Sequence, residues 1–225
     1  MTLVPGGRGV LRRGRGMAEP AALPVVPAYA NRTLILACVL SFVLQLPPER
    51  FAFVPAYFFG TMELAGPLPT LAVWRGLFGH VFIHADILHL ACNMAFLLPF
   101  GNAVEATVGH WRYLLLFFAG AVAGALLEGA IATDPMAPLI GASGAICGVL
   151  GAFVILRPRP FALLYRPALW IVVGFGLLNL YMVVVPPAAG SPLAEIGWGA
   201  HLGGCAAGIA LALLMRPAAA RRAGG

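Results

Sequence analysis

Six apolar stretches, each about the length of a membrane-spanning helix, constrain the fold of this chain more than any other feature. They cover residues 28–46, 86–106, 111–131, 136–156, 167–186 and 198–215. A helix needs about 20 residues, at about 1.5 Å each, to cross the hydrocarbon core of a bilayer. Prolines follow the first stretch directly and the fourth stretch after one arginine, and proline ends a helix. The pattern predicts an all-α integral membrane protein, a bundle of six transmembrane helices.

The composition supports a membrane protein. Charged residues make up only 10% of the chain and hydrophobic residues 61%, whereas a soluble domain carries about 25% charged residues. The four cysteines each lie in an apolar stretch, without the spacing of a zinc site or a disulfide framework, which favours buried, reduced thiols. They are Cys38, Cys92, Cys147 and Cys205. We expect neither a metal nor a cofactor.

The chain divides into three predicted parts. Residues 1–27 are rich in Gly, Pro and Arg and lack the apolar core of a signal peptide, which favours a disordered cytoplasmic tail. Met17 is a second candidate start that the sequence leaves open. Residues 28–216 form the predicted membrane domain, and residues 217–225 form a short cytoplasmic tail.

A long segment, residues 47–85, connects the first two apolar stretches and is not a polar loop. It is rich in aromatic residues, which favour the membrane interface. They are Phe51, Phe53, Tyr57, Phe58, Phe59 and Trp74. We expect an interfacial loop partly immersed in one leaflet.

The arginines predict the orientation. With the N-terminus inside, twelve of the fourteen arginines are cytoplasmic and only Arg50 and Arg75 are external. This is the positive-inside pattern, so both termini are predicted to be cytoplasmic, in the inner membrane if the protein is bacterial. The pattern also explains the net charge of +6 without a nucleic-acid partner.

Four polar side chains inside the apolar stretches are predicted to meet: His89, Asn93, Ser143 and His201. Polar groups within a span are costly and usually functional. Counting about 1.5 Å per residue from the cytoplasmic helix ends places them about 18 to 24 Å up, in one layer below the outer edge of a core about 30 Å thick. His89 and Asn93, which are four residues apart, lie on the same face of their helix.

Ser143 and His201 suggest nucleophilic catalysis. A serine hydroxyl is a weak nucleophile until a base removes its proton, and a histidine exchanges protons near neutral pH. No acidic residue within the last three stretches is placed to orient His201, since Glu195 precedes the sixth. The sequence therefore predicts a Ser–His dyad rather than a triad.

Donors for an oxyanion are available in the same layer. A tetrahedral intermediate needs preorganised hydrogen-bond donors, and the His89 imidazole, the Asn93 amide and the Ser143 backbone N–H can supply them. The run Gly141-Ala142-Ser143-Gly144 predicts a turn into a helix start, where free N–H groups face an anion. Small residues on the fourth and sixth stretches predict that these two helices pack closely.

Over most of residues 33–215 the sequence resembles the rhomboid family of intramembrane serine proteases. Residues 141–144 fit the family's G-x-S-G motif, and residues 200–204, which include Gly203, resemble its A-H-x-x-G motif. His84, His89 and Asn93 match its H-x4-H-x3-N pattern. The order of these motifs along the helices makes the resemblance specific.

The resemblance extends to residues outside the catalytic layer. Trp74-Arg75 resembles the paired Trp-Arg of the first long loop, implying a structural role, and Glu105 matches a Glu that closes the second helix. Ser143 would be the nucleophile and His201 the general base, acting on transmembrane protein substrates in the lipid bilayer. By the same resemblance, Asn93 and His89 would form the oxyanion hole.

Two positions are interpreted separately. Bacterial members carry an aromatic residue four positions after the serine, stacked on the catalytic histidine, but this chain has Cys147 there. An aromatic side chain from another helix is expected to replace it. For His84 we expect local hydrogen bonding rather than catalysis.

Two other functions are compatible with a six-helix membrane protein. An inactive rhomboid relative would bind client proteins without cutting them, but such proteins usually lack the serine or the histidine. A small transporter would show internal repeats, and the sequence has none that we detect.

Overall fold

The computed structural model describes residues 27–62, 69–157, 162–188 and 190–215, so the predicted tails lie, apart from Pro27, outside the described residues. The described chain is helical apart from turns and one isolated bridge between Phe53 and Leu139. The long helices are α1 (Tyr29–Val43), α5 (Ile87–Phe96), α7 (His110–Ile131), α8 (Ser143–Leu156), α9 (Ala162–Val184) and α10 (Trp198–Met215). The prediction of an all-α fold is confirmed.

Within the described residues, four helical units are long and apolar enough to cross a membrane: Ile87–Val108, His110–Ile131, Tyr165–Val184 and Trp198–Met215. The remaining two predicted spans correspond to the shorter apolar helices α1 and α8, of 15 and 14 residues. The first unit is α5 continued by a π-helical turn, η2 (Leu97–Gly101), and by α6 (Asn102–Val108). The turn contains Pro99, which lacks the N–H of a regular α-helical bond.

The predicted start of the fourth span was wrong. Residues 136–142 are not helical, and α8 begins seven residues later than expected, at Ser143. The backbone of Leu139 is instead paired with Phe53, and Gly141 has φ +109°. Only glycine adopts that conformation easily, so the chain enters α8 through a sharp turn. The fifth span also differs, because α9 begins at Ala162 and contains Pro167.

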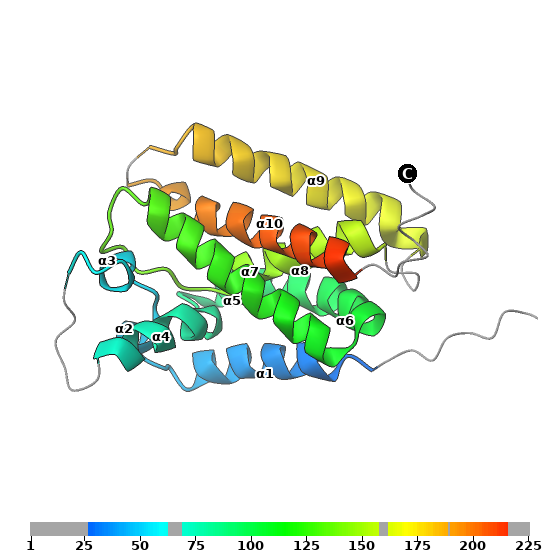
Figure 1. The fold of residues 1–225 in the computed structure, drawn as a ribbon, viewed down its shortest axis with the longest axis horizontal. Coiled ribbons are helices and arrows are strands. Elements are labelled where there is room, and N and C mark those ends of the chain that lie inside the picture. Colours follow the sequence, from blue (N-terminus) through cyan, green and yellow to red (C-terminus); the bar gives the residue numbers. More distant parts are fainter. Residues whose placement is uncertain (1–26, 63–68, 158–161, 189, 216–225) are drawn as a thin grey trace, which may run out of the picture.

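Helix α10 packs closely on both α8 and α7, which also contact each other, and is drawn between α9 and α7 in Figure 1. A Cβ atom on Gly204 would overlap the carbonyl oxygen of Gly144, and one on Gly208 would overlap that of Gly148. On Gly203, it would meet the Ala123 carbonyl of α7 at 2.5 Å. Such glycines allow backbones to approach in lipid. The predicted pairing of the fourth and sixth helices is confirmed, but Gly203 faces α7.

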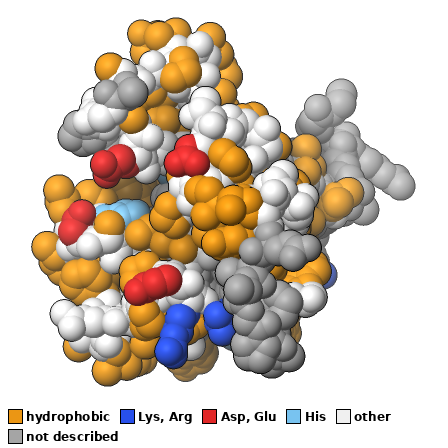
Figure 2. Space-filling view, turned by 90° about the vertical axis from the view of Figure 1, so that its left-hand side faces the viewer, with side chains coloured by type: hydrophobic (Ala, Val, Ile, Leu, Met, Phe, Trp, Pro, Cys, Tyr) orange, Lys and Arg blue, Asp and Glu red, His pale blue; other side chains and the backbone are white. Residues whose placement is uncertain are grey.

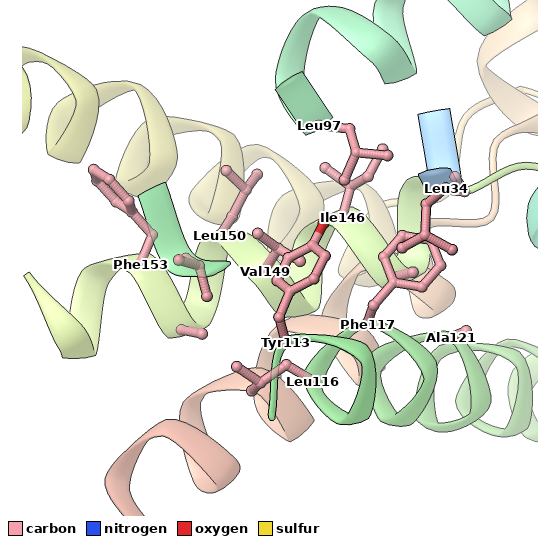
Figure 3. Packing of buried hydrophobic residues seen from close by; sticks show 14 of the residues in the cluster. Leu34, Leu97, Tyr113, Leu116, Phe117, Ala121, Ile146, Val149, Leu150 and Phe153 are labelled. Atoms are coloured by element: carbon pink, nitrogen blue, oxygen red, sulfur yellow. The ribbon is translucent and has the colours of Figure 1, made fainter. Parts of the chain in front are cut away.

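Helix α8 is enclosed by its neighbours. Every residue from Gly144 to Phe153 is buried, as is expected of a helix that is apolar on all sides. Figure 3 shows Tyr113 of α7 directed at Ile146 and Val149 of α8, Phe117 of α7 directed at Leu34 of α1, and Leu97 of η2 on the other side of Ile146. This packing holds the N-terminus of α8, where Ser143 lies, in a fixed position.

The segment between α1 and α5 consists of short helices. They are α2 (Pro48–Phe51), α3 (Pro55–Phe58), α4 (Pro69–Gly79) and the 3₁₀ turn η1 (His80–Phe82). In α4, the half-exposed Trp74 contacts the Phe58 ring edge-on. Arg75 donates through Nε to the Arg50 carbonyl at 2.6 Å. The segment is an organised layer at one end of the bundle, and its immersion in a leaflet stays a prediction.

At the end of the bundle opposite the α2–α4 layer, a buried polar network connects the start of α1 to α6 and α7. The Glu105 carboxylate accepts from the backbone N–H groups of Ala30 at 2.9 Å and Asn31 at 2.7 Å, and contacts His110 Nδ1 at 2.5 Å. The Tyr113 hydroxyl donates to Asn31 Oδ1, and the Asn31 amide donates to the Leu97 carbonyl. Glu105 is fully buried, so these bonds stabilise its desolvated carboxylate.

Candidate active site

Ser143 is the first residue of α8, and the turn before it is held by the segment between α1 and α5. Phe53 and Leu139 exchange two backbone hydrogen bonds, of 3.1 and 2.8 Å. The Gly141 N–H donates to the His80 carbonyl at 2.9 Å. The first N–H groups of a helix have no partner within it, so the Ser143 N–H is available to bind an anion.

His201 lies in the first turns of α10, with a side chain only 7% exposed. Its Nδ1 atom is 2.6 Å from Oδ1 of Asn179, on α9. The Phe175 ring of α9 lies 5.6 Å from the imidazole, centroid to centroid, and Trp198 meets it edge-on at 5.8 Å. The imidazole is therefore fixed by one hydrogen bond and two aromatic rings.

The structure brings the chain next to Ser143 against the chain next to His201. A Cβ on Gly144 would lie 3.2 Å from the Ala200 carbonyl oxygen, so the residues adjoining Ser143 and His201 are in van der Waals contact. Among the described residues, no hydrogen bond joins Ser143 to His201. Catalytic hydrogen bonds are often long in a free enzyme and tighten when substrate binds.

His89 and Asn93, on α5, lie on the other side of the same turn. A Cβ on Gly141 would be 2.7 Å from His89 Nε2, which places the imidazole directly against the backbone before Ser143. The Asn93 amide donates to the His89 carbonyl at 2.8 Å, while its Oδ1 is buried without a partner. His89 therefore lies against the turn that leads into Ser143, the residue before His201 lies against Gly144, and Asn93 lies one helical turn after His89 on α5.

The expectation of local hydrogen bonding by His84 is supported only by an electrostatic interaction with the backbone of Phe82, which is outside hydrogen-bond geometry. Its side chain is buried, and within the described chain neither ring nitrogen has a hydrogen-bond partner. The ring instead meets His89 edge-on at 5.1 Å. Burial, and secondarily the nearby His89, lower the pKa of His84, which keeps the ring neutral at physiological pH.

Sequence reasoning missed two residues of α9. Asn179 was detectable, because it is a polar residue inside the 167–186 apolar stretch. Phe175 was not, because its contact with His201 depends on how α9 packs. Cys147 is itself buried, and Phe175 provides an aromatic ring from another helix, as expected.

Figure 2 shows the end of the molecule that carries the α2–α4 layer. A histidine side chain is visible in a hollow of this surface, between hydrophobic and acidic side chains. At least one histidine is thus reachable from the surface at this end. Across the described ranges, no group of three or more His, Cys, Asp or Glu side chains could hold a metal ion.

Comparison with known proteins identifies the family. A model of the rhomboid domain matches residues 71–218. "Rhomboid protease GluP" of Bacillus subtilis is 28% identical over 183 residues, covering 81% of this chain and 34% of that protein. "Rhomboid protein 1, mitochondrial" of Saccharomyces cerevisiae is 32% identical over 139 residues, covering 59% of this chain and 39% of that protein.

A relative with a different name is also similar. "Inactive rhomboid-related protein 2" of Caenorhabditis elegans is 25% identical over 190 residues, covering 77% of this chain and 53% of that protein. The chain thus spans about a third to a half of the length of these three relatives. Since the domain model matches more than half of the chain, this protein belongs to the rhomboid family.

Proposed function

We propose that this protein is an intramembrane serine endopeptidase that hydrolyses peptide bonds in or near the transmembrane segments of other proteins. The observation that carries the proposal is the contact between Gly144 and Ala200, the residues next to Ser143 and His201 at the start of two closely packed helices. A relative named as a protease supports the same activity.

In the proposed reaction, His201 accepts the proton of the Ser143 hydroxyl as Oγ attacks the scissile carbonyl carbon. The oxyanion that forms is stabilised by the Ser143 N–H, the Asn93 amide and the His89 imidazole. His201 then gives the proton to the leaving amine, and the C–N bond breaks to leave an acyl-enzyme. Water, deprotonated by His201, hydrolyses that ester and restores the serine.

The length of α8 suggests where substrates are cut. Its 14 residues rise about 21 Å, so with the C-terminus of α8 at the cytoplasmic edge, Ser143 lies about 9 Å below the outer edge of a core about 30 Å thick. A substrate helix must unwind locally before its carbonyl can be attacked. We expect cleavage after a small residue in the outer third of the substrate span, located by mass spectrometry of the fragments. Cuts near the cytoplasmic end would contradict this.

The orientation is part of the proposal. Both termini are proposed to be cytoplasmic, because twelve of fourteen arginines then lie inside. The start of α1 and the end of α10 lie at the same end of the bundle (Figure 1). A reporter fused after Gly225 should be cytoplasmic and one inserted near Asp134 external. The reverse result at either position would overturn the orientation.

The activity is tested on the three serines of the chain. A fluorophosphonate probe should label wild type at Ser143, and Ser143→Ala should abolish both labelling and the cleavage of a transmembrane substrate. Ser41→Ala and Ser191→Ala are matched controls and should label like wild type. His201→Ala should label far more weakly, and undiminished labelling in that variant would refute His201 as the base.

A second candidate function is the binding of client proteins without cleavage. A relative named as inactive belongs to the same family. If purified wild-type protein is neither labelled nor active, while it still retains a transmembrane client in a pull-down, this second function replaces the first.

A further inference from the structure

Asn179 is an unusual residue in its surroundings. It lies on α9, whose side chains are mostly exposed; of those described, only Val172 and Asn179 are buried. Asn179 is 2% exposed and lies 2.6 Å, through Oδ1, from His201 Nδ1. A polar group inside a membrane helix is costly without a partner. Asn179, the one buried polar side chain among those described on α9, has His201, the candidate base, as its partner.

We infer that Asn179 is a positioning residue that fixes the tautomer and orientation of His201, converting the dyad expected from the sequence into a Ser143–His201–Asn179 triad. The inference rests on the proposed function for its catalytic consequence. A neutral amide orients a catalytic histidine in the same way in cysteine proteases of the Cys-His-Asn type. The hydrogen bond itself is a property of this chain and does not depend on catalysis.

The orientation of the Asn179 amide follows from its second hydrogen bond. Its Nδ2 donates to the Phe175 carbonyl at 2.6 Å. A carbonyl oxygen only accepts hydrogen bonds, so the amide nitrogen must face Phe175 and the amide oxygen must face His201. The contact from Phe175 thereby fixes which atom of Asn179 the imidazole meets.

The tautomer of His201 then follows. An amide oxygen accepts, so Nδ1 of His201 must carry the proton and donate it to Asn179. In the neutral ring, Nε2 is left with a lone pair, as a general base requires. When His201 takes the serine proton, Nδ1–H keeps its bond to Asn179, which stabilises the imidazolium without placing a second charge in the membrane.

The test compares three substitutions on α9. Asn179→Leu removes the acceptor, Asn179→Asp keeps it, and Val172→Ala is the matched control, since it removes packing from the other buried residue of α9. We expect Asn179→Leu to lower kcat about 10- to 100-fold with little change in KM. This is less than the about 10⁴-fold loss known when a charged triad acceptor is replaced. Val172→Ala should keep kcat within about 2-fold of wild type.

The Asn179→Asp variant tests the role of Asn179 through the pH dependence of kcat/KM, which would not change if Asn179 were only structural. A carboxylate favours the charged imidazolium more than an amide does, so a higher pH is needed to free the base. The acidic limb of kcat/KM against pH should therefore move to higher pH, with activity at alkaline pH well above that of Asn179→Leu. Wild-type kcat in Asn179→Leu, or an unmoved limb in Asn179→Asp, would overturn the inference.

A measurement without turnover separates this inference from the proposed function. In ¹⁵N-histidine NMR, with His201→Gln to assign the signal, wild type should show His201 protonated at Nδ1, and Asn179→Leu should show a mixture of tautomers or the Nε2–H form. A proton on Nε2 in wild type overturns the inference even if the protein cuts. Protonation at Nδ1 in an inactive wild type overturns only the proposed function.

Discussion

Two buried polar clusters lie at opposite ends of the bundle and differ in how well their hydrogen bonds are satisfied. In the cluster that we call inner, because its end is proposed to be cytoplasmic, Glu105, Asn31 and Tyr113 satisfy one another and the backbone at the start of α1. In the cluster that we call outer, at the end proposed to be external, His84 and Asn93 carry three of the four buried side-chain atoms that lack a partner in the described chain. Satisfied hydrogen bonds, as in the inner cluster, are typical of a structural contact, and unsatisfied ones, as in the outer cluster, are typical of a binding site.

The physical reason is the penalty for an unmade bond. A buried donor or acceptor without a partner costs about 1–3 kcal/mol, so unpaired groups persist only where something compensates. A histidine is visible in a surface hollow at this end of the molecule (Figure 2), where a substrate can supply partners. We therefore expect substitutions in the outer cluster to change activity, and those in the inner cluster to change stability.

The largest expected effect is on activity, in the outer cluster. Asn93→Ala should lower turnover about 10- to 1000-fold, as loss of one oxyanion donor does, while the free energy of unfolding in SDS changes by less than about 1 kcal/mol. His89→Ala should act in the same direction. Full activity in both variants and in the double variant would remove these residues from the proposed oxyanion hole.

Next in size is a stability effect in the inner cluster. Glu105→Ala removes the acceptor of two α1 N–H groups, leaves them buried and unpaired, and should lower the free energy of unfolding by about 3 kcal/mol. The exposed Glu49 provides the matched control, and Glu49→Ala should fall within about 0.5 kcal/mol of wild type. If Glu105→Ala and Glu49→Ala have the same free energy of unfolding, the inner cluster does not stabilise the fold and the two clusters do not differ as proposed.

A smaller effect tests one bond of the inner network. Tyr113→Phe deletes only the hydroxyl that donates to Asn31, and should lower the free energy of unfolding by about 1 kcal/mol with unchanged kcat. Tyr181, on the exposed side of α9, serves as the control through Tyr181→Phe. A loss of activity at unchanged stability in Tyr113→Phe would show that the inner network also acts on the site.

The smallest expected effect concerns His84 and its dependence on pH. Burial is the largest cause of the lowered pKa of His84 and of His80, so their unfolded forms bind protons first as pH falls. Stability should therefore be full above about pH 6.5, the ordinary histidine value, and decline below it. His84→Phe should match wild-type stability within about 0.5 kcal/mol at pH 7.5 and decline less on acidification. A steeper decline in His84→Phe would reverse this interpretation.

The sequence predicted which segments form the apolar helices, because insertion of a segment into a membrane depends on its local composition. An apolar run of about 20 residues has few alternatives to a helix in lipid, since every backbone group must be satisfied within the segment. The sixth stretch, residues 198–215, matches α10 at both ends. By the same logic, depth counting predicts one layer for His89, Asn93, Ser143 and His201, because helical rise is constant.

Tertiary structure decided the features that depend on contacts between distant segments. The start of α8 at Ser143 follows from the pairing of Leu139 with Phe53, 86 residues earlier, and not from the apolar run that contains it. The partner of His201 lies on α9, and the direction of the Asn179 amide is set by the Phe175 carbonyl. Composition indicates which segments are helices and predicts how deep each residue lies, but only packing fixes which faces meet and therefore which polar atoms become partners.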